Sequence, residues 1–254
     1  MKKINHLPSS KNLLSSYLKK IPSFLYPPRC PICEKIPPKG YLICSSCYSS
    51  ISFVKQPFCY SCGKPLETAE QELCFDCTKH PKSFTGGFSL AIYNHVTKPA
   101  LSAIKYKNRR QHLNFFLEET LTRYGALFQT LSLDAILPVP IHPKRMKKRG
   151  YNQASLFAIA LGKQLCVPVY DSVLIRTVNT LPQKTLSPEK RLENLRRAFS
   201  LHPELSNAKL PFQKVLLVDD IYTTGATLEA ITGILKQADV KDVYIFSICI
   251  GNGY

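Results

Sequence analysis

The sequence contains no long apolar run. None of its stretches approaches the ~20 consecutive apolar residues that a membrane-spanning helix requires, and the most apolar one, 243–250, has the length of a buried strand. The first residues carry several lysines but no continuous apolar segment, so they do not resemble a secretory signal peptide. We therefore expect no membrane span and a cytoplasmic location.

Acidic residues are scarce as well. The 254 residues include 34 Lys and Arg but only 17 Asp and Glu, which gives a net charge of +17. A charge of this size attracts nucleic acid, anionic lipid or a phosphorylated small molecule, although a basic surface can also serve solubility alone. Clustering favours contact with a polyanion. The clusters comprise Lys105, Lys107, Arg109 and Arg110, and then Lys144, Arg145, Lys147, Lys148 and Arg149.

Cysteine, by contrast, is abundant and concentrated near the N-terminus. Both thiolates of a CxxC turn can point at one metal ion, so two such turns complete a tetrahedral zinc site. Disulfides would require export, and four redox dithiols in one small module would be unusual. We therefore predict two structural Zn²⁺ ions. Their ligands are eight of the ten cysteines, in four pairs: Cys30/Cys33, Cys44/Cys47, Cys59/Cys62 and Cys74/Cys77.

The segment 26–80 is predicted to be a double zinc ribbon, and the basic segment 1–25 before it has no assigned role. Because 26–80 has too few apolar residues for a core, bound metal is expected to supply its folding free energy. The near-equal gaps leave open which pairs share an ion; sequential coupling is favoured because it closes shorter loops. The remaining Cys166 and Cys249 lie in apolar runs and are predicted to be core thiols.

From residue 84 to residue 254 the sequence alternates between strand and helix patterns. Strands are expected at 88–96, 134–141, 169–177, 214–220 and 243–250, and helices at 98–107, 112–131, 152–166, 191–199 and 223–238. The polar segment 178–190 is expected to be an exposed, movable loop. This alternation predicts an α/β domain with a mostly parallel sheet.

The stretch 215–227, VLLVDDIYTTGAT, carries the strongest chemical signal of this domain. Ligands of open α/β sheets bind beyond the carboxyl ends of strands, and the free N–H groups that begin a helix favour phosphate. Asp219 and Asp220 would repel that phosphate, so we assign them to neutral hydroxyls of the same ligand. The pattern predicts a phosphorylated sugar, and the GxxxxGK[ST] motif of P-loop proteins is absent. Its 5-phosphate would lie on the turn Thr223, Thr224, Gly225, Ala226 and Thr227.

This stretch resembles the loop with which type I phosphoribosyltransferases bind phosphoribosyl pyrophosphate (PRPP) together with Mg²⁺. Two further stretches, 138–154 (PVPIHPKRMKKRGYNQA) and 176–199 (RTVNTLPQKTLSPEKRLENLRRAF), and the four CxxC pairs resemble the ComF family, competence proteins of bacterial DNA uptake. The resemblance covers roughly 26–251. It implies a type I phosphoribosyltransferase-like, mostly parallel α/β sheet behind a double zinc ribbon.

The resemblance also implies roles for residues outside the acidic stretch. The loop 138–142 would hold pyrophosphate, and the run RGYNQ at 149–153 opens a helix, for which a basic loop with a helix-capping Asn is the plainer interpretation. The residues concerned are Pro140, His142, Arg145, Arg149, Asn152 and Gln153 in the pyrophosphate and basic loop, and Thr180, Gln183, Arg191 and Asn194 in a flexible segment that could close over the ligand. If the protein is an enzyme, Asp219, Asp220 and Arg149 form the catalytic set.

Three hypotheses of function follow. The first is a competence protein of natural transformation that handles incoming single-stranded DNA, binds PRPP, and works beside helicase-like or recombination-mediator proteins. The second is an active phosphoribosyltransferase, although no acceptor pocket is identifiable in the sequence. The third is a scaffold whose zinc ribbons dock proteins and whose phosphate site is regulatory. The basic residues favour the first over the third, and the expected DNA contacts are Lys105, Lys107, Arg109, Arg110, Lys144, Lys147 and Lys148.

Overall fold

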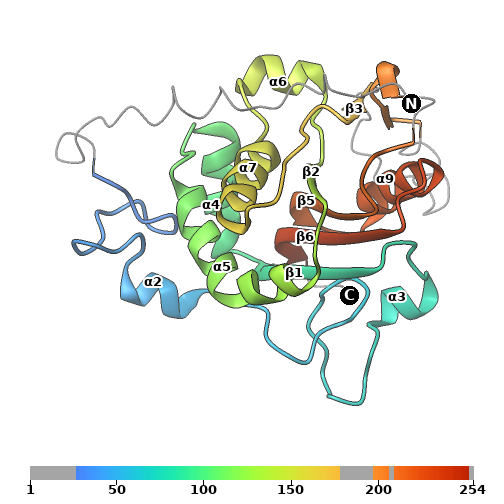
Figure 1. The fold of residues 1–254 in the computed structure, drawn as a ribbon. Helices are drawn as coiled ribbons and strands as arrows, with labels where there is room; N and C mark the ends of the chain where they lie inside the picture. Colours follow the sequence, from blue (N-terminus) through green and yellow to red (C-terminus); the bar gives the residue numbers. More distant parts are fainter. Residues whose placement is uncertain (1–26, 178–196, 206–208, 252–254) are drawn as a thin grey trace, which may run out of the picture.

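A four-stranded parallel sheet forms the centre of the computed structural model, which describes residues 27–177, 197–205 and 209–251 (Figure 1). Most residues of its strands are buried, as a parallel sheet covered by helices requires. The predicted mostly parallel α/β sheet is thus confirmed. In spatial order the strands are β1 (Gly86–Tyr93), β6 (Asp242–Gly251), β5 (Lys214–Tyr222) and β2 (Ala135–Pro138).

The two faces of the sheet are covered by different elements (Figure 1). On one face, here called the α7 face, pack α4 (Thr97–Tyr106), α5 (His112–Thr130) and α7 (Gln153–Leu165). The other, the α9 face, carries α9 (Ala226–Gln237), the antiparallel pair β3 (Leu174–Arg176) and β4 (Phe199–Leu201), and the short turn η1 (Pro203–Leu205). Each face has its own hydrophobic core.

The carboxyl ends of the strands meet at one edge. Val218 of β5 lies opposite Pro138 of β2, and Tyr222 lies opposite Ile250 of β6. The loop that follows β2 and the acidic end of β5 are therefore neighbours, as the resemblance implied. The predicted strand at 169–177 shrinks to β3, while Val169 forms only a single bridge to Ile136.

Capping residues set the bounds of the two helices after β2. His142 precedes α6 (Pro143–Arg149), and its Nδ1 accepts a hydrogen bond from the N–H of Lys144 at 3.2 Å. Gly150 ends α6 in the left-handed region, with φ of 80°. Asn152 then caps α7, since its Oδ1 accepts from the N–H of Ala154 at 3.1 Å.

The cysteine-rich segment, which includes α2 (Ser45–Ser50) and α3 (Phe75–Lys79), adds to the outer edge of the sheet. The N–H of Val54 donates to the carbonyl of Leu90 at 2.9 Å, and the N–H of Ile92 donates to the carbonyl of Ser52 at 2.8 Å. Apolar residues of the segment enter both cores, Ile51 on the α7 face and Val54 on the α9 face. The segment thus shares the cores of the sheet domain.

The two isolated cysteines differ in environment. Cys249 in β6 is fully buried, as predicted. Cys166 is exposed, so its prediction as a core thiol is wrong. The reason is local: α7 ends at Leu165, and Cys166 follows as its cap in the left-handed region, with φ of 57°, outside the buried stripe of the helix.

Among the described residues, no helix is both long and apolar enough to span a bilayer.

Candidate functional site

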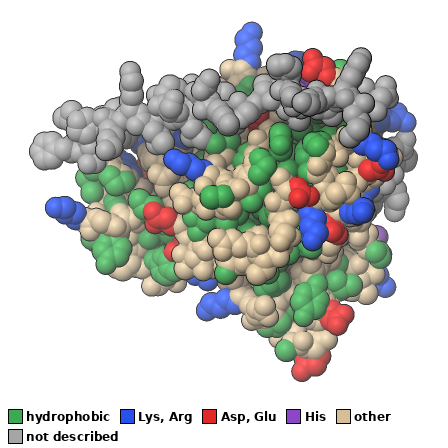
Figure 2. All heavy atoms as spheres, viewed as in Figure 1, with side chains coloured by type: hydrophobic (Ala, Val, Ile, Leu, Met, Phe, Trp, Pro, Cys, Tyr) green, Lys and Arg blue, Asp and Glu red, His purple; other side chains and the backbone are tan. Residues whose placement is uncertain are grey.

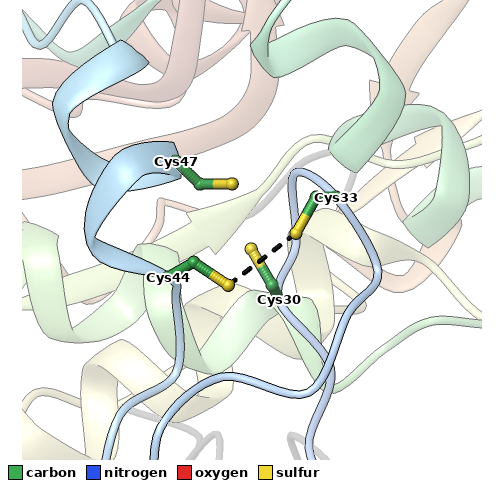
Figure 3. A group of neighbouring side chains, drawn as sticks. All are labelled: Cys30, Cys33, Cys44 and Cys47. Carbon is green, nitrogen blue, oxygen red and sulfur yellow. Dashed lines mark hydrogen bonds between the residues drawn. The ribbon is translucent and has the colours of Figure 1, made fainter.

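Four cysteines from two turns converge in the first metal site (Figure 3). Cys30 and Cys33 lie on one loop, and Cys44 and Cys47 lie at the start of α2 and within it. Their sulfurs all lie within 4.8 Å of one another, and those of Cys33 and Cys44 are 3.8 Å apart. With Zn–S bonds of about 2.3 Å, a tetrahedron places its sulfurs about 3.8 Å apart.

The second site repeats this arrangement with the remaining pairs, Cys59/Cys62 and Cys74/Cys77. The sulfurs of Cys62 and Cys74 are 3.6 Å apart. Each site is thus formed by consecutive pairs, which confirms the favoured sequential coupling. Three of the four cysteines are buried here, compared with only Cys30 in the first site.

The chemistry of the donors fits a cation. Burial raises the pKa of Cys44 to about 11 and that of Cys47 to about 12, and the neighbouring thiols act in the same direction. A bound Zn²⁺ stabilises clustered thiolates and keeps them deprotonated. The two four-cysteine groups are therefore zinc-binding sites.

Asp219 and Asp220 lie near the carboxyl end of β5, and they point to opposite sides because successive side chains of a strand alternate. Asp220 is buried towards the α7 face. Its Oδ2 accepts a hydrogen bond from Nε2 of Gln153 at 2.6 Å and forms an ion pair with Nζ of Lys105 at 2.7 Å. Arg149 in turn donates to Oε1 of Gln153. The RGYNQ run and the acidic strand end thus form one network.

Among the residues that the structure describes, no lysine forms an ion pair with Asp219. One of its carboxylate oxygens accepts a hydrogen bond from the N–H of Asp220 at 2.8 Å. Burial raises the pKa of Asp219 to about 7, and the charge of Asp220 acts in the same direction, against the smaller influence of Lys105 and Arg176. Hydrogen bonds donated by a ligand would stabilise the ionised form of this carboxylate.

The turn after β5 is shaped by one glycine. Gly225 has φ of 75° and immediately precedes α9, whose first turn leaves backbone N–H groups without intrahelical partners. Thr223 and Thr224 are exposed beside it. The ring of Tyr222 packs directly beneath, because a Cβ on Gly225 would lie 2.6 Å from Cζ of Tyr222. The turn can therefore offer amides and hydroxyls to an anion.

The predicted pyrophosphate loop lies beside these groups. The N–H of Val139 donates to the carbonyl of Val218 at 2.8 Å, and the carbonyl of Val139 accepts from Nδ2 of Asn152 at 2.9 Å. Pro140 and His142 are buried here, whereas Arg145 is exposed on α6. The flexible-segment residues Thr180, Gln183, Arg191 and Asn194 lie outside the described residues.

The two basic clusters meet in space. The guanidinium of Arg149 lies 5.6 Å from the ring centre of Tyr106, at the end of α4, and that of Arg110 lies 4.1 Å from the ring of Tyr151. Lys144, Lys147 and Lys148 are exposed on α6. On the face seen in Figure 2, charges of both signs are interspersed, so the basic excess forms no single patch there.

Other members of the first cluster have partners within the protein. Lys107 and Arg109 lie 3.8 Å and 3.6 Å from the carboxylate of Glu34, next to the first zinc site. Lys105 is turned inward to Asp220. Sequence reasoning missed this role, yet a signal existed: Lys105 follows the buried Leu101 by four residues and so lies on the buried stripe of α4.

Comparison with known families matches both parts of the chain. The double zinc ribbon domain matches residues 21–78, and the phosphoribosyl transferase domain matches residues 153–253. With the two four-cysteine sites and the parallel sheet, these matches define a double zinc ribbon joined to a type I phosphoribosyltransferase-like domain.

Similar proteins of known name identify the family to which this chain belongs. The chain is 32% identical over 170 residues to Competence protein F of Haemophilus influenzae, which covers 63% of this chain and 71% of the relative. It is 27% identical over 161 residues to Competence protein ComFC of Bacillus subtilis, covering 63% and 62%, and 28% identical over 166 residues to DNA utilization protein YhgH of Escherichia coli K12, covering 63% and 70%. The chain belongs to the ComF family.

Solved structures add little to this. A hypoxanthine phosphoribosyltransferase from Staphylococcus aureus matches with 17% identity, a TM-score of 0.35, and coverage of 56% of this chain and 64% of that one. A similarity at this level carries no argument about ligand or activity.

Proposed function

We propose that this protein acts in natural transformation, where it handles incoming single-stranded DNA in the cytoplasm and binds PRPP with Mg²⁺. The names of two relatives, Competence protein F and Competence protein ComFC, support the role in competence. The phosphoribosyl transferase match over residues 153–253 supports the ligand. The observation that carries the proposal is the meeting of the acidic strand end, the Gln153–Arg149 pair and the amide-rich turn at one edge of the sheet.

In the proposed site, one set of residues binds the charged phosphate of the ligand and another set binds its neutral hydroxyl groups. The 5-phosphate lies on the amides and hydroxyls of residues 223–227, where the helix dipole favours an anion. The ribose hydroxyls donate to Asp219, whose carboxylate pairs with no lysine of the described part of the chain, and to Asp220. Arg145 and Arg149 follow the loop 138–142 on α6 and provide positive charge for the pyrophosphate, whose negative charge Mg²⁺ would also neutralise.

The DNA surface is the region where α4 and α6 end side by side. Tyr106 is 75% exposed, which leaves its ring accessible to a nucleic-acid base. Arg149 lies over that ring, and the exposed Lys147 and Lys148 belong to the same helix end. An aromatic platform within a basic surface binds single strands without sequence preference. Helicase-like or recombination-mediator proteins are the partners we propose for this stage of DNA uptake.

A matched pair of tyrosines tests the DNA surface. Tyr106→Ala should weaken binding of a fluorescent single-stranded oligonucleotide, measured by anisotropy, by about 1–3 kcal/mol if one base stacks there. Tyr41→Ala, at the comparably exposed Tyr41 in the cysteine-rich segment, serves as the control and should leave affinity unchanged. Equal effects of the two changes on DNA affinity would show that Tyr106 is not part of the DNA-binding surface.

A second candidate function is transfer of the ribosyl group. The acidic pair and Arg149 favour it, because carboxylates beside the sugar and positive charge on the leaving pyrophosphate stabilise an oxocarbenium-like transition state. A screen for pyrophosphate release from PRPP across amine and nucleobase acceptors tests it. Release that depends on an acceptor and disappears in Asp219→Asn would establish transfer, whereas binding without release would leave PRPP as a ligand only.

A further inference from the structure

Tyr222 is linked to two features of the molecule. It directly precedes the turn of residues 223–227, here called the phosphate turn, and its side chain shares a buried core with three cysteines of the second zinc site. Tyr222 is the last residue of β5 and directly precedes Thr223. Its side chain is buried, with 3% of the residue exposed. We infer that Tyr222 is a positioning residue through which the second zinc site holds the phosphate turn in its binding conformation, so that metal at this site controls phosphoribosyl binding. The inference rests on the proposed phosphoribosyl function.

The first contact is between Tyr222 and the turn. A Cβ on Gly225 would lie 2.6 Å from Cζ and 2.9 Å from Cε2 of Tyr222, so the ring packs against the glycine backbone without a gap. Gly225 also has φ of 75°, a conformation that glycine adopts at little energetic cost. The side chain of Tyr222 therefore packs directly against this left-handed turn and supports its conformation.

The second contact is between Tyr222 and the metal site. Tyr222 belongs to the same buried cluster as Cys59, Cys62 and Cys77, together with Leu228 of α9. The ring thus shares one buried core with three of the four metal ligands and also contacts the turn.

A third contact joins the same elements from outside. The N–H of Ser83, just after α3, donates to Oε2 of Glu229 in the first turn of α9 at 2.9 Å. The segment that carries Cys74 and Cys77 is thus attached to the helix that begins at the phosphate turn. Loss of the metal would free both attachments at once.

The first zinc site has a different environment and supplies the control. Glu34 of its first loop pairs with Lys107 and Arg109, and Tyr48 of α2 donates to Oε2 of Glu119 in α5 at 3.2 Å. These neighbours belong to the α7 face. Removal of this metal would loosen the contacts of Glu34 and Tyr48 and leave both the Lys105–Asp220 pair and the cluster around Tyr222 in place.

The experiment compares two variants that each lose two ligands. Cys62→Ser with Cys74→Ser removes the second site, and Cys33→Ser with Cys44→Ser removes the first. Metal analysis should show one zinc per chain in both. Calorimetric titration with PRPP and Mg²⁺ should show an affinity loss of about tenfold or more for the second-site variant, within the usual range of coupling between sites, and little change for the first-site variant.

Two measurements keep the test decisive if the second-site variant folds poorly. Tyr222→Leu retains both zincs and removes the ring, and it should weaken PRPP binding and speed hydrogen exchange of the amides of residues 223–227. In the first-site variant, which keeps only the second zinc, saturating PRPP should slow zinc release to a coloured chelator, because coupling between sites is reciprocal. In the second-site variant, PRPP should leave zinc release unchanged.

The outcomes separate the inference from the function on which it rests. Failure of the wild-type protein to bind PRPP would overturn both. Normal wild-type binding, with equal losses in the two zinc-site variants or with unchanged affinity and exchange in Tyr222→Leu, would overturn the coupling alone.

Discussion

The two faces of the central sheet carry the same kinds of parts, an aspartate and a zinc site each, in different surroundings. The α7 face holds Asp220 with its lysine partner, the basic ends of α4 and α6, and the first zinc site. The α9 face holds the second zinc site, Tyr222 and the helix that follows the phosphate turn. Residues neighbouring in sequence, such as Asp219 and Asp220, are therefore in different environments. We therefore expect the two zinc sites, and likewise the two aspartates, to differ in what they contribute.

The largest expected difference between the faces concerns protein stability after zinc loss. Cys62→Ser with Cys74→Ser should lower the free energy of unfolding by about 4 kcal/mol or more, because it removes a metal and places a hydroxyl in a core. Cys33→Ser with Cys44→Ser should cost less, since both residues are partly exposed. Chemical denaturation followed by circular dichroism measures both, and equal losses would end the distinction between the sites.

Replacement of Asp220 should mainly lower protein stability, whereas replacement of Asp219 should mainly weaken ligand binding. Asp220→Ala should cost about 3–5 kcal/mol, because it leaves Lys105, with 18% of its side chain exposed, without its buried partner. Lys105→Met in the same chain should recover part of that loss. Asp219→Ala should change stability little and weaken PRPP binding. Thermal denaturation with calorimetric titration checks the division; comparable destabilisation by both changes would contradict it.

Salt dependence sharpens the assignment of DNA binding to the α7 side. Replacing Lys144, Lys147 and Lys148 with Glu should flatten the plot of log affinity against log salt, by about 0.7 for each lost phosphate contact. A control with the same change in charge is available near α9, where Lys209, Lys236 and Lys241 are exposed. Fluorescence anisotropy at several salt concentrations should show a smaller change for the control, and the reverse result would move the DNA surface to the α9 face.

The smallest effect concerns pH and Asp219. Its folded pKa, about 7, lies above the ordinary value of 3.8, so its protonated form stabilises the fold. That contribution is complete below pH about 4 and is lost as pH rises through about 7. PRPP affinity should change in the opposite direction, since the carboxylate accepts the ribose hydroxyls. Titrations at pH 6 to 8, relative to Asp219→Asn, isolate this residue; a pH profile that this change leaves unaltered would exclude it.

Local pattern was enough to predict much of this molecule. CxxC spacing brings the two sulfurs of one turn to the same metal, although it left the pairing of the turns open. Strand–turn–helix order places the acids and Gly225 at a sheet edge. Contacts between distant segments could not be predicted. The ion pair of Lys105 with Asp220 depends on how α4 packs. The burial of Tyr222 in one core with cysteines of the second zinc site depends on the cysteine-rich segment sharing that core with the sheet.

Contacts between distant segments also explain why the cysteine-rich segment 26–80 differs from its prediction. Its few apolar residues suggested a module held together by metal alone, but Ile51 and Val54 enter the two cores of the sheet domain. Zinc removal should therefore also affect the edge strand β1, to which residues 52–54 are hydrogen-bonded.

The most direct test of the central claim is calorimetric titration of the wild-type protein and of Gly225→Val with PRPP and Mg²⁺. We predict a saturable exothermic binding curve for the wild type. In Gly225→Val the affinity should fall at least ~100-fold, because a β-branched side chain conflicts with the left-handed turn and with the Tyr222 ring beneath it. Absence of wild-type binding at millimolar PRPP, or unchanged affinity in Gly225→Val, would contradict the assignment of the phosphate to this turn.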